Sequence, residues 1–193
     1  MARHRIPDTG DSPATGPNAE QIQYWNHASG PGWVAAQARI DGQVAPFGLL
    51  AMERAGIVEG ERVLDVGCGT GQSTLQLVER VGRKGSVTGI DVSAPMLARA
   101  TERAKQAGFK NVSFLRADAQ THRFDPRHFD LIYSRFGVMF FADPRAAFAN
   151  LRTALTPGGH LSFVCWQERA KNPWMLEPLL AAGRHIQLPA PPA

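Results

Sequence analysis

The chain has 193 residues, of which 44% are hydrophobic and 20% are charged, and its formal net charge is +4. That apolar share excludes a globally disordered chain, and two cysteines are too few for a disulfide framework or a four-thiolate zinc site. No apolar run reaches the roughly 18 residues that span a bilayer, and none follows the N-terminal arginines as in a secretory signal. We therefore expect a soluble, cytoplasmic protein of one ordinary domain without a membrane partner.

The two ends of the chain have a composition that does not suit a packed core. Residues 1–19 are rich in Pro, Gly, Ser, Thr and Asp and predict a disordered tail, and residues 188–193 predict a Pro-rich tail. Between the tails we expect a helical segment over residues 20–56 and an α/β domain over residues 57–187.

The helical segment contains residues that interrupt helices. Gly30-Pro31-Gly32 predicts a turn between two helical pieces. Gly42 and Pro46 predict an interruption of the second piece, which runs from Trp33 toward Ala55.

From residue 62 onward, short apolar runs alternate with segments in which apolar residues recur every three or four positions. The apolar runs predict strands over Arg62–Val66, Ser86–Ile90, Val112–Leu115, Phe129–Ser134 and His160–Trp166. Strands that alternate with helices in this way are typical of a parallel sheet covered by helices on both faces.

Two of the helix starts carry capping signals. Ser93 is expected to cap the helix that contains Pro95, and Asp143 precedes Pro144 as an N-cap before a first-turn proline.

The strongest functional signal is Val63–Gly71, where a buried strand leads into three alternating glycines and then into a helix. Gly67, Gly69 and Gly71 have no Cβ, so the backbone there can turn sharply and approach a ligand closely. A glycine-rich loop alone is shared by many nucleotide folds, and an ordinary tight turn is the alternative.

Two carboxylates follow where an adenosine ligand needs them. Asp91 ends the second predicted strand, about 20 residues after the last glycine, and can accept hydrogen bonds from two ribose hydroxyls. Asp118 follows the third strand and can accept from an adenine amino group. The alternatives are a capping or solvated aspartate at the first position and a loop aspartate at the second.

Two features favour an adenosine cofactor other than NAD. The dinucleotide fingerprint has a small residue three positions after its second glycine, and Gln72 stands there. Asp65 lies at the mouth of the loop, where a negative charge opposes a pyrophosphate and favours a ligand with an ammonium and a sulfonium. The alternative for Asp65 is a carboxylate that bonds N–H groups of the loop.

These segments together resemble the class I S-adenosylmethionine-dependent methyltransferases. Val63–Gly71 resembles their first motif, Gly89–Ser93 their second, and Ala117–Ala119 their third, which contacts adenine. Phe129–Ser134 resembles their fourth strand, and Leu155–Leu161 resembles the turn into the fifth. Within the family, the chain is similar to the small-molecule branch that includes ubiquinone/menaquinone-type C-methyltransferases.

The resemblance implies a Rossmann-like doubly wound sheet with strand order 3-2-1-4-5, a helical N-terminal lid and S-adenosylmethionine as cofactor. It assigns to the cofactor Asp65, Gly67, Cys68, Gly69, Gly71, Asp91, Val92, Met96, Asp118, Ala119 and Ser134. In these roles the glycine loop lines the methionine, Asp65 organises the loop and the ammonium end, and Val92 and Met96 pack on the adenine. Ser134 and Arg135 would face the transferring methyl group, although Met96 also fits a plain core and Arg135 a surface cation.

The acceptor is expected to be a small molecule. Tyr133–Phe136 lacks the Asn/Asp-Pro-Pro-aromatic pattern of branches that methylate amide or nucleobase nitrogens, and no basic track suggests nucleic acid. No acidic cluster predicts a metal. Tyr24 and Trp33, with neighbouring aromatic residues, are expected to close over the acceptor, although a helical layer packed on the sheet edge is equally consistent. We expect no particular catalytic base.

The C-terminal part is short for this family. Residues 167–193 contain a helix start at Asn172-Pro173, which Pro178 is expected to disrupt, and no alternating run for strands six and seven. The fifth strand should therefore form an open edge through which the chain could form a homodimer. The alternatives to a methyltransferase are a NAD-dependent oxidoreductase and a cofactor-binding partial domain without catalysis.

Overall fold

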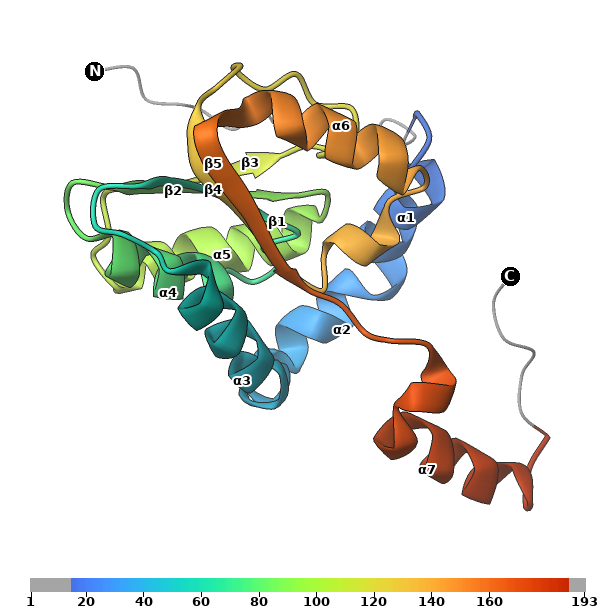
Figure 1. Ribbon diagram of the computed structural model, residues 1–193. Coiled ribbons are helices and arrows are strands. Elements are labelled where there is room, and N and C mark those ends of the chain that lie inside the picture. The colour runs from blue at the N-terminus through green and yellow to red at the C-terminus, as the bar shows by residue number, and fades with distance from the viewer. Residues whose placement is uncertain (1–14, 188–193) are drawn as a thin grey trace.

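The computed structural model describes residues 15–187 (Figure 1). Of the predicted tails, residues 1–14 and 188–193 lie outside the described residues. The first tail was predicted to extend to residue 19, but Asn18 is buried and Ala19 begins a helix. One sheet has the strand order β3-β2-β1-β4-β5, and each neighbouring pair is parallel. The strands are β1 (Arg62–Val66), β2 (Ser86–Asp91), β3 (Val112–Arg116), β4 (Phe129–Arg135) and β5 (Leu155–Val164). The expected Rossmann-like sheet and its strand order are confirmed.

Helices cover both faces of the sheet. Four helical segments precede it: α1 (Ala19–Gln23), the π-helical η1 (Tyr24–Ala28), α2 (Gly30–Ala35) and α3 (Gln37–Ala55). The crossovers and turns contain α4 (Gln72–Val81), α5 (Ala94–Gln106), the short η2 (Val138–Phe140) and α6 (Pro144–Ala154). After β5 come the short η3 (Arg169–Lys171) and α7 (Pro173–Gly183).

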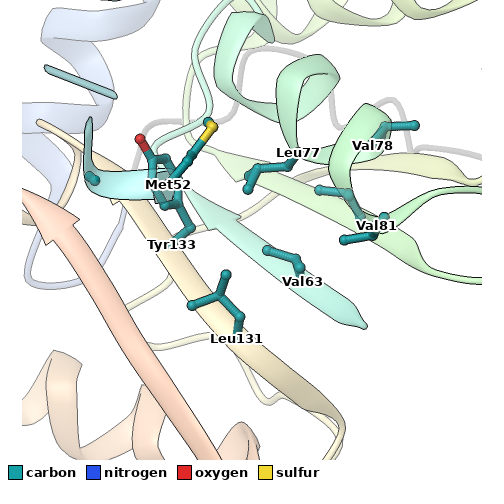
Figure 2. Close-up of a cluster of buried hydrophobic side chains, with 9 residues drawn as sticks. Met52, Val63, Leu77, Val78, Val81, Leu131 and Tyr133 are labelled. Atoms are coloured by element: carbon teal, nitrogen blue, oxygen red, sulfur yellow. The ribbon is translucent and has the colours of Figure 1, made fainter. Parts of the chain in front are cut away.

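Neighbouring residues of a strand belong to different cores because side chains alternate across the sheet. Val63 faces the cluster of Figure 2, which contains Met52, Leu77, Val78, Val81, Leu131 and Tyr133 and joins α3 and α4 to the sheet. Leu64 faces the opposite cluster, which contains Val66, Ile132, Leu151 and Ala154 and joins α6 to the sheet.

The N-terminal helices are not interrupted at the predicted residues. Gly30 and Pro31 begin α2 rather than forming a turn, and the link to the preceding helix is Ser29. Helix α3 runs through Pro46 without a break. Proline removes the hydrogen bond to the carbonyl four residues earlier, and that residue is the exposed Gly42, so water can satisfy the carbonyl.

One predicted helix cap is confirmed and one is wrong. The Asp143 side chain accepts a hydrogen bond from the Ala146 N–H at 2.9 Å, and Pro144 follows it. Ser93 occupies the N-cap position of α5, but its hydroxyl donates to the Trp25 carbonyl at 2.8 Å. The hydroxyl therefore fastens η1 to the start of α5 instead of capping the helix.

The fifth strand begins earlier than predicted and ends earlier. Leu155 already pairs with Phe129, whereas His160 pairs with Leu131, so the intervening residues form an irregularity in the strand. The glycines that predicted a turn before the strand lie inside this irregularity, and Gly158 has a φ of +85°.

The C-terminal segment leaves the body of the molecule after β5. The sheet of the described residues has five strands, as expected, and β5 is an edge strand with Phe163 46% exposed. Helix α7 projects away from the sheet (Figure 1) and contains Pro178 without a break, so the predicted disruption was wrong. Dimerisation through the β5 edge stays a prediction. No helix among residues 15–187 has the length and apolar character needed to cross a membrane.

Candidate active site

A cavity of about 390 Å³ lies where the strands end at their carboxyl side. The loops after the five strands line it, together with side chains from α1, η1, α2, α3 and α7. The predicted site residues that line it are Trp33, Gly67, Cys68, Gly69, Asp91, Val92, Met96, Asp118, Ala119 and Arg135. Parallel α/β sheets bind ligands at this end of their strands, which makes the cavity the candidate site.

The three glycines after β1 are required by close contacts. Gly67, Gly69 and Gly71 all have positive φ values, of 68°, 56° and 85°. A Cβ on Gly67 would lie 2.6 Å from the Cα of Gly137, and one on Gly71 would lie 2.8 Å from the Cβ of Ala100. Gly71 therefore permits packing of the loop against α5 and does not line the cavity, whereas Gly67 and Gly69 do.

Asp65 is fully buried beneath the glycine loop and does not line the cavity. Its Oδ2 accepts hydrogen bonds from the hydroxyls of Ser73 and Thr74, both at 2.7 Å, while its Oδ1 has no partner among the described residues. Burial raises the pKa of Asp65 from 3.8 to about 6. The carboxylate thus fixes the first turn of α4 rather than the loop N–H groups.

Asp91 reaches the cavity from the end of β2. Its Oδ2 accepts a hydrogen bond from the Gly69 N–H at 2.8 Å, and its Oδ1 accepts one from the Ser93 N–H at 2.9 Å. Burial raises the pKa of Asp91. Each carboxylate oxygen can accept a second hydrogen bond, so the pair can still receive two hydroxyls of a ligand.

Asp118 lies on the cavity wall after β3 and is held by a residue that the sequence analysis missed. The Asn18 side chain is 5% exposed and donates to Oδ2 of Asp118 at 2.8 Å. Its own Oδ1 accepts from the Ala142 N–H at 2.7 Å, so Asn18 ties the start of α1 to two loops of the site. The position of an asparagine directly before a helix start is the one signal that could have separated it from the tail.

Aromatic side chains also line the cavity. Trp25 packs edge-on against Trp33 and Phe140, with ring centroids 5.5 and 5.3 Å apart. Phe136 stacks on Trp166 with centroids 4.3 Å apart. These five residues all line the cavity and together form what we call the aromatic chamber, whereas the predicted Tyr24 is 50% exposed and does not line the cavity.

The end of β4 supplies two residues with different surroundings. Ser134 is buried outside the cavity, where its hydroxyl donates to the Val66 carbonyl at 2.7 Å and accepts the Val138 N–H at 3.3 Å. Arg135 lines the cavity and donates through Nη1 to Oε1 of Gln72. Burial lowers the pKa of Arg135.

The histidines and the tyrosine that could act as a base do not line the cavity. The Tyr133 hydroxyl donates to the Gly48 carbonyl at 2.9 Å, and burial raises its pKa. A ring nitrogen of His160 lies 2.9 Å from the Ala55 carbonyl, and His27 is exposed. Within the described chain, no three His, Cys, Asp or Glu residues are grouped to hold a metal.

Known proteins share both the sequence and the fold. Residues 63–159 match the family described as "Methyltransferase domain". The chain is 37% identical over 118 residues to the aklanonic acid methyltransferase DauC of Streptomyces sp. (strain C5), covering 61% of this chain and 54% of that protein. It is also 37% identical over 135 residues to the ubiquinone/menaquinone biosynthesis C-methyltransferase UbiE of Shewanella piezotolerans, covering 66% and 54%. The chain thus spans about half the length of the curated relatives it matches.

Two solved structures show the likeness in three dimensions. A SAM-dependent methyltransferase from Aquifex aeolicus superposes with a TM-score of 0.60 at 25% identity, over 85% of this chain and 87% of that one. The [4+2]-cyclase SpnF superposes with a TM-score of 0.57 at 31% identity, over 61% and 43%. The predicted resemblance is confirmed: the chain belongs to the methyltransferase-domain family, which uses S-adenosyl-L-methionine.

Proposed function

We propose that this protein binds S-adenosylmethionine in the cavity and transfers its methyl group to a small-molecule acceptor. The observation that carries the proposal is the meeting of a glycine loop and two strand-end carboxylates, Asp91 and Asp118, in one cavity with an aromatic chamber beside them. The glycine loop and the carboxylates match the polar groups of the cofactor, and the aromatic chamber suits an apolar acceptor.

The donor set fits the cofactor. Gly69 presents bare backbone to the cavity, and Met96, whose Cε would lie 2.9 Å from a Cβ at this position, lines the cavity beside it. Gly67, Cys68 and Gly69 would border the methionine, and Asp91 would accept the ribose hydroxyls. Asp65 would act from behind the loop, as a buried negative charge beneath the ammonium group.

The adenine would lie between β2 and β3. Val92 and Met96 line the cavity there and would pack on the ring, while Asp118 would accept from its amino group and Ala119 would border it. Asn18 would keep the Asp118 carboxylate in place through the hydrogen bond that they share.

The cofactor supplies an activated methyl group for in-line displacement. What remains for the chain is to hold the two reactants in line and to exclude water, and positioning of this kind can supply roughly 7–11 kcal/mol. Trp25 and Trp33 would exclude water from above, and Phe136 would border the acceptor from the sheet.

The names of the relatives support a small-molecule acceptor. The name of one refers to aklanonic acid and that of another to ubiquinone and menaquinone biosynthesis. The aromatic wall around Trp33 and Phe140 is the part of this chain that would bind such a molecule.

Calorimetry with S-adenosylhomocysteine tests the proposal. Asp91→Ala removes the ribose acceptors, and charged hydrogen bonds of this kind predict an affinity about ten- to a hundredfold lower than wild type. The matched control is Asp125→Ala, because Asp125 is exposed and does not line the cavity. No binding to wild type, or equal affinity in Asp91→Ala, would contradict the proposal, and binding without turnover on any acceptor would favour a non-catalytic protein.

A further inference from the structure

Helix α5 begins shortly after Asp91 and Val92, the residues assigned to the ribose and the adenine, and its N-cap side chain does not cap it. Ser93 occupies the N-cap position, but its hydroxyl donates to the Trp25 carbonyl at 2.8 Å. The first N–H groups of a helix have no partner within the helix, so another group has to satisfy them. For α5 this group comes from a distant part of the chain.

The side chain of Asn26 in η1 supplies the missing cap. Its Oδ1 accepts a hydrogen bond from the Ala94 N–H at 2.9 Å, so the first N–H of α5 has an acceptor. Its Nδ2 donates to the Val92 carbonyl at 3.0 Å and to the Ile22 carbonyl of α1 at 2.7 Å. Both ends of the amide therefore hold the backbone that follows β2.

The π-helical turn of η1 provides the bond in the other direction. The Ser29 N–H donates to the Tyr24 carbonyl at 2.9 Å, five residues earlier, rather than to the Trp25 carbonyl four residues earlier. The Trp25 carbonyl is thereby left for the Ser93 hydroxyl. Gly30 permits the close approach, because a Cβ there would lie 2.0 Å from the Trp25 carbonyl oxygen and 2.9 Å from Oγ of Ser93. Segment η1 and the start of α5 thus exchange hydrogen bonds in both directions.

This exchange joins the cofactor part of the cavity to the aromatic chamber. The Ser93 N–H donates to Oδ1 of Asp91 at 2.9 Å, so the backbone that Asn26 holds also orients the carboxylate assigned to the ribose. Trp25, the neighbour of Asn26, belongs to the aromatic chamber. Asn26 itself does not line the cavity, so it can act on a ligand only through these neighbours.

We propose that Asn26 is a positioning residue, which caps α5 from η1 and thereby holds Asp91 and Val92 in their cofactor-binding geometry. The inference rests on the proposed function and deepens it, because it adds a residue through which the N-terminal helices contribute to cofactor binding. Without the cap, the backbone between Val92 and Ala94 leaves that geometry for part of the time. The apparent affinity for the cofactor then falls with the fraction of molecules that stay competent to bind.

Calorimetry with S-adenosylhomocysteine on wild type, Asn26→Ala and Asn26→Asp tests the inference. Asn26→Ala should bind about fivefold or more weakly, which corresponds to the ordinary contribution of a helix cap. Asn26→Asp keeps an acceptor for the Ala94 N–H and loses only the donors, so it should recover most of the affinity. Equal affinities of wild type and Asn26→Ala overturn the inference, and so does an Asn26→Asp variant that binds as weakly as Asn26→Ala.

Asn111→Ala is the matched control for a loss of stability alone. The Nδ2 of Asn111 donates to the carbonyls of Gly82 and Gly85, both at 2.9 Å, so this amide also joins segments that are distant in the sequence. Asn111 precedes β3, at the opposite end of the strand from the cavity, and does not line the cavity. Urea unfolding measures the stability of each variant, and Asn111→Ala should lower the stability without changing the affinity. If it weakens binding as much as Asn26→Ala does, the inference is overturned.

A second ligand shows which part of the cofactor is affected. 5′-Methylthioadenosine contains the adenosine of S-adenosylhomocysteine but lacks the amino-acid group. Because Asn26 acts through Asp91 and Val92, which are assigned to the adenosine, Asn26→Ala should weaken the binding of both ligands by the same factor. A loss confined to S-adenosylhomocysteine would assign the effect to the amino-acid end and overturn the inference. Failure of wild type to bind either ligand contradicts the proposed function instead.

Discussion

Asp65 makes the stability of this protein depend on pH in a direction opposite to that of most aspartates. Its pKa is raised from 3.8 to about 6 because the carboxyl group is fully buried. A raised pKa means that the folded state favours the protonated acid, so ionisation opposes folding as the pH rises from about 4 to about 6. At 1.36 kcal/mol per pH unit, the difference between the two pKa values corresponds to about 3 kcal/mol of stability lost above pH 6.

Asp65→Asn removes this titration and keeps the size of the side chain. The amide oxygen can still accept from Ser73 and Thr74, but the new NH2 group would occupy the place of Oδ1, which has no partner among residues 15–187. The substitution therefore lowers the free energy of unfolding by an amount that does not depend on pH. Only the way in which the stability difference between variant and wild type changes with pH tests the reasoning. Relative to wild type, Asp65→Asn should gain about 2 kcal/mol between pH 4 and pH 8, because part of the roughly 3 kcal/mol is already lost at pH 4.

Urea unfolding of both proteins at pH 4, 5, 6, 7 and 8 measures this difference, provided that the m-values agree. Asp125→Asn is the control, because it makes the same change at an exposed side chain. A flat difference between wild type and Asp65→Asn, or one that falls as the pH rises, would refute the reasoning. The second outcome would mean that Arg135 and the two hydroxyls stabilise the carboxylate more than burial destabilises it.

Three further substitutions test separate parts of the structure. Asn18→Ala should lower the affinity for S-adenosylhomocysteine severalfold in calorimetry, because Asp118 loses the side chain that holds it. An unchanged affinity would show that the start of α1 does not contribute to cofactor binding. Trp33→Ala should reduce turnover more than thermal stability, and loss of several kcal/mol of stability with normal residual turnover would make Trp33 core instead. Phe163→Lys on the exposed edge strand should convert a dimer to a monomer in light scattering, whereas a wild-type monomer would contradict the predicted edge pairing.

The sheet could be predicted from the sequence because its signals are local. A buried parallel strand is a short apolar run, and the run Arg62–Val66 has the bounds that β1 has in the structure. The start of β5 could not be predicted in the same way. Gly158 and its neighbours have the composition of a turn. In the structure, however, Leu155 already pairs with Phe129, and the glycines lie within an irregular part of the strand.

The wall of the cavity was harder to predict because it depends on helix phase and on long-range contacts. Tyr24 and Trp25 lie in a π-helical turn, in which hydrogen bonds join residues five apart rather than four, so an α-helical face cannot tell which of the two points inward. The structure places Trp25 at the cavity and Tyr24 half in solvent. Asn18 lies in a segment with the composition of a tail, and its hydrogen bonds to residues far along the chain place it at the site.

Asp65 shows how the site is expected to couple ligand binding to stability. Its carboxyl group is fully buried, and its Oδ1 has no partner among the described residues. A buried charge with incomplete pairing lowers the stability of the fold. An ammonium group above the glycine loop would compensate that charge. Cofactor should therefore stabilise wild type more than Asp65→Asn, because the variant has lost the charge that the ammonium compensates.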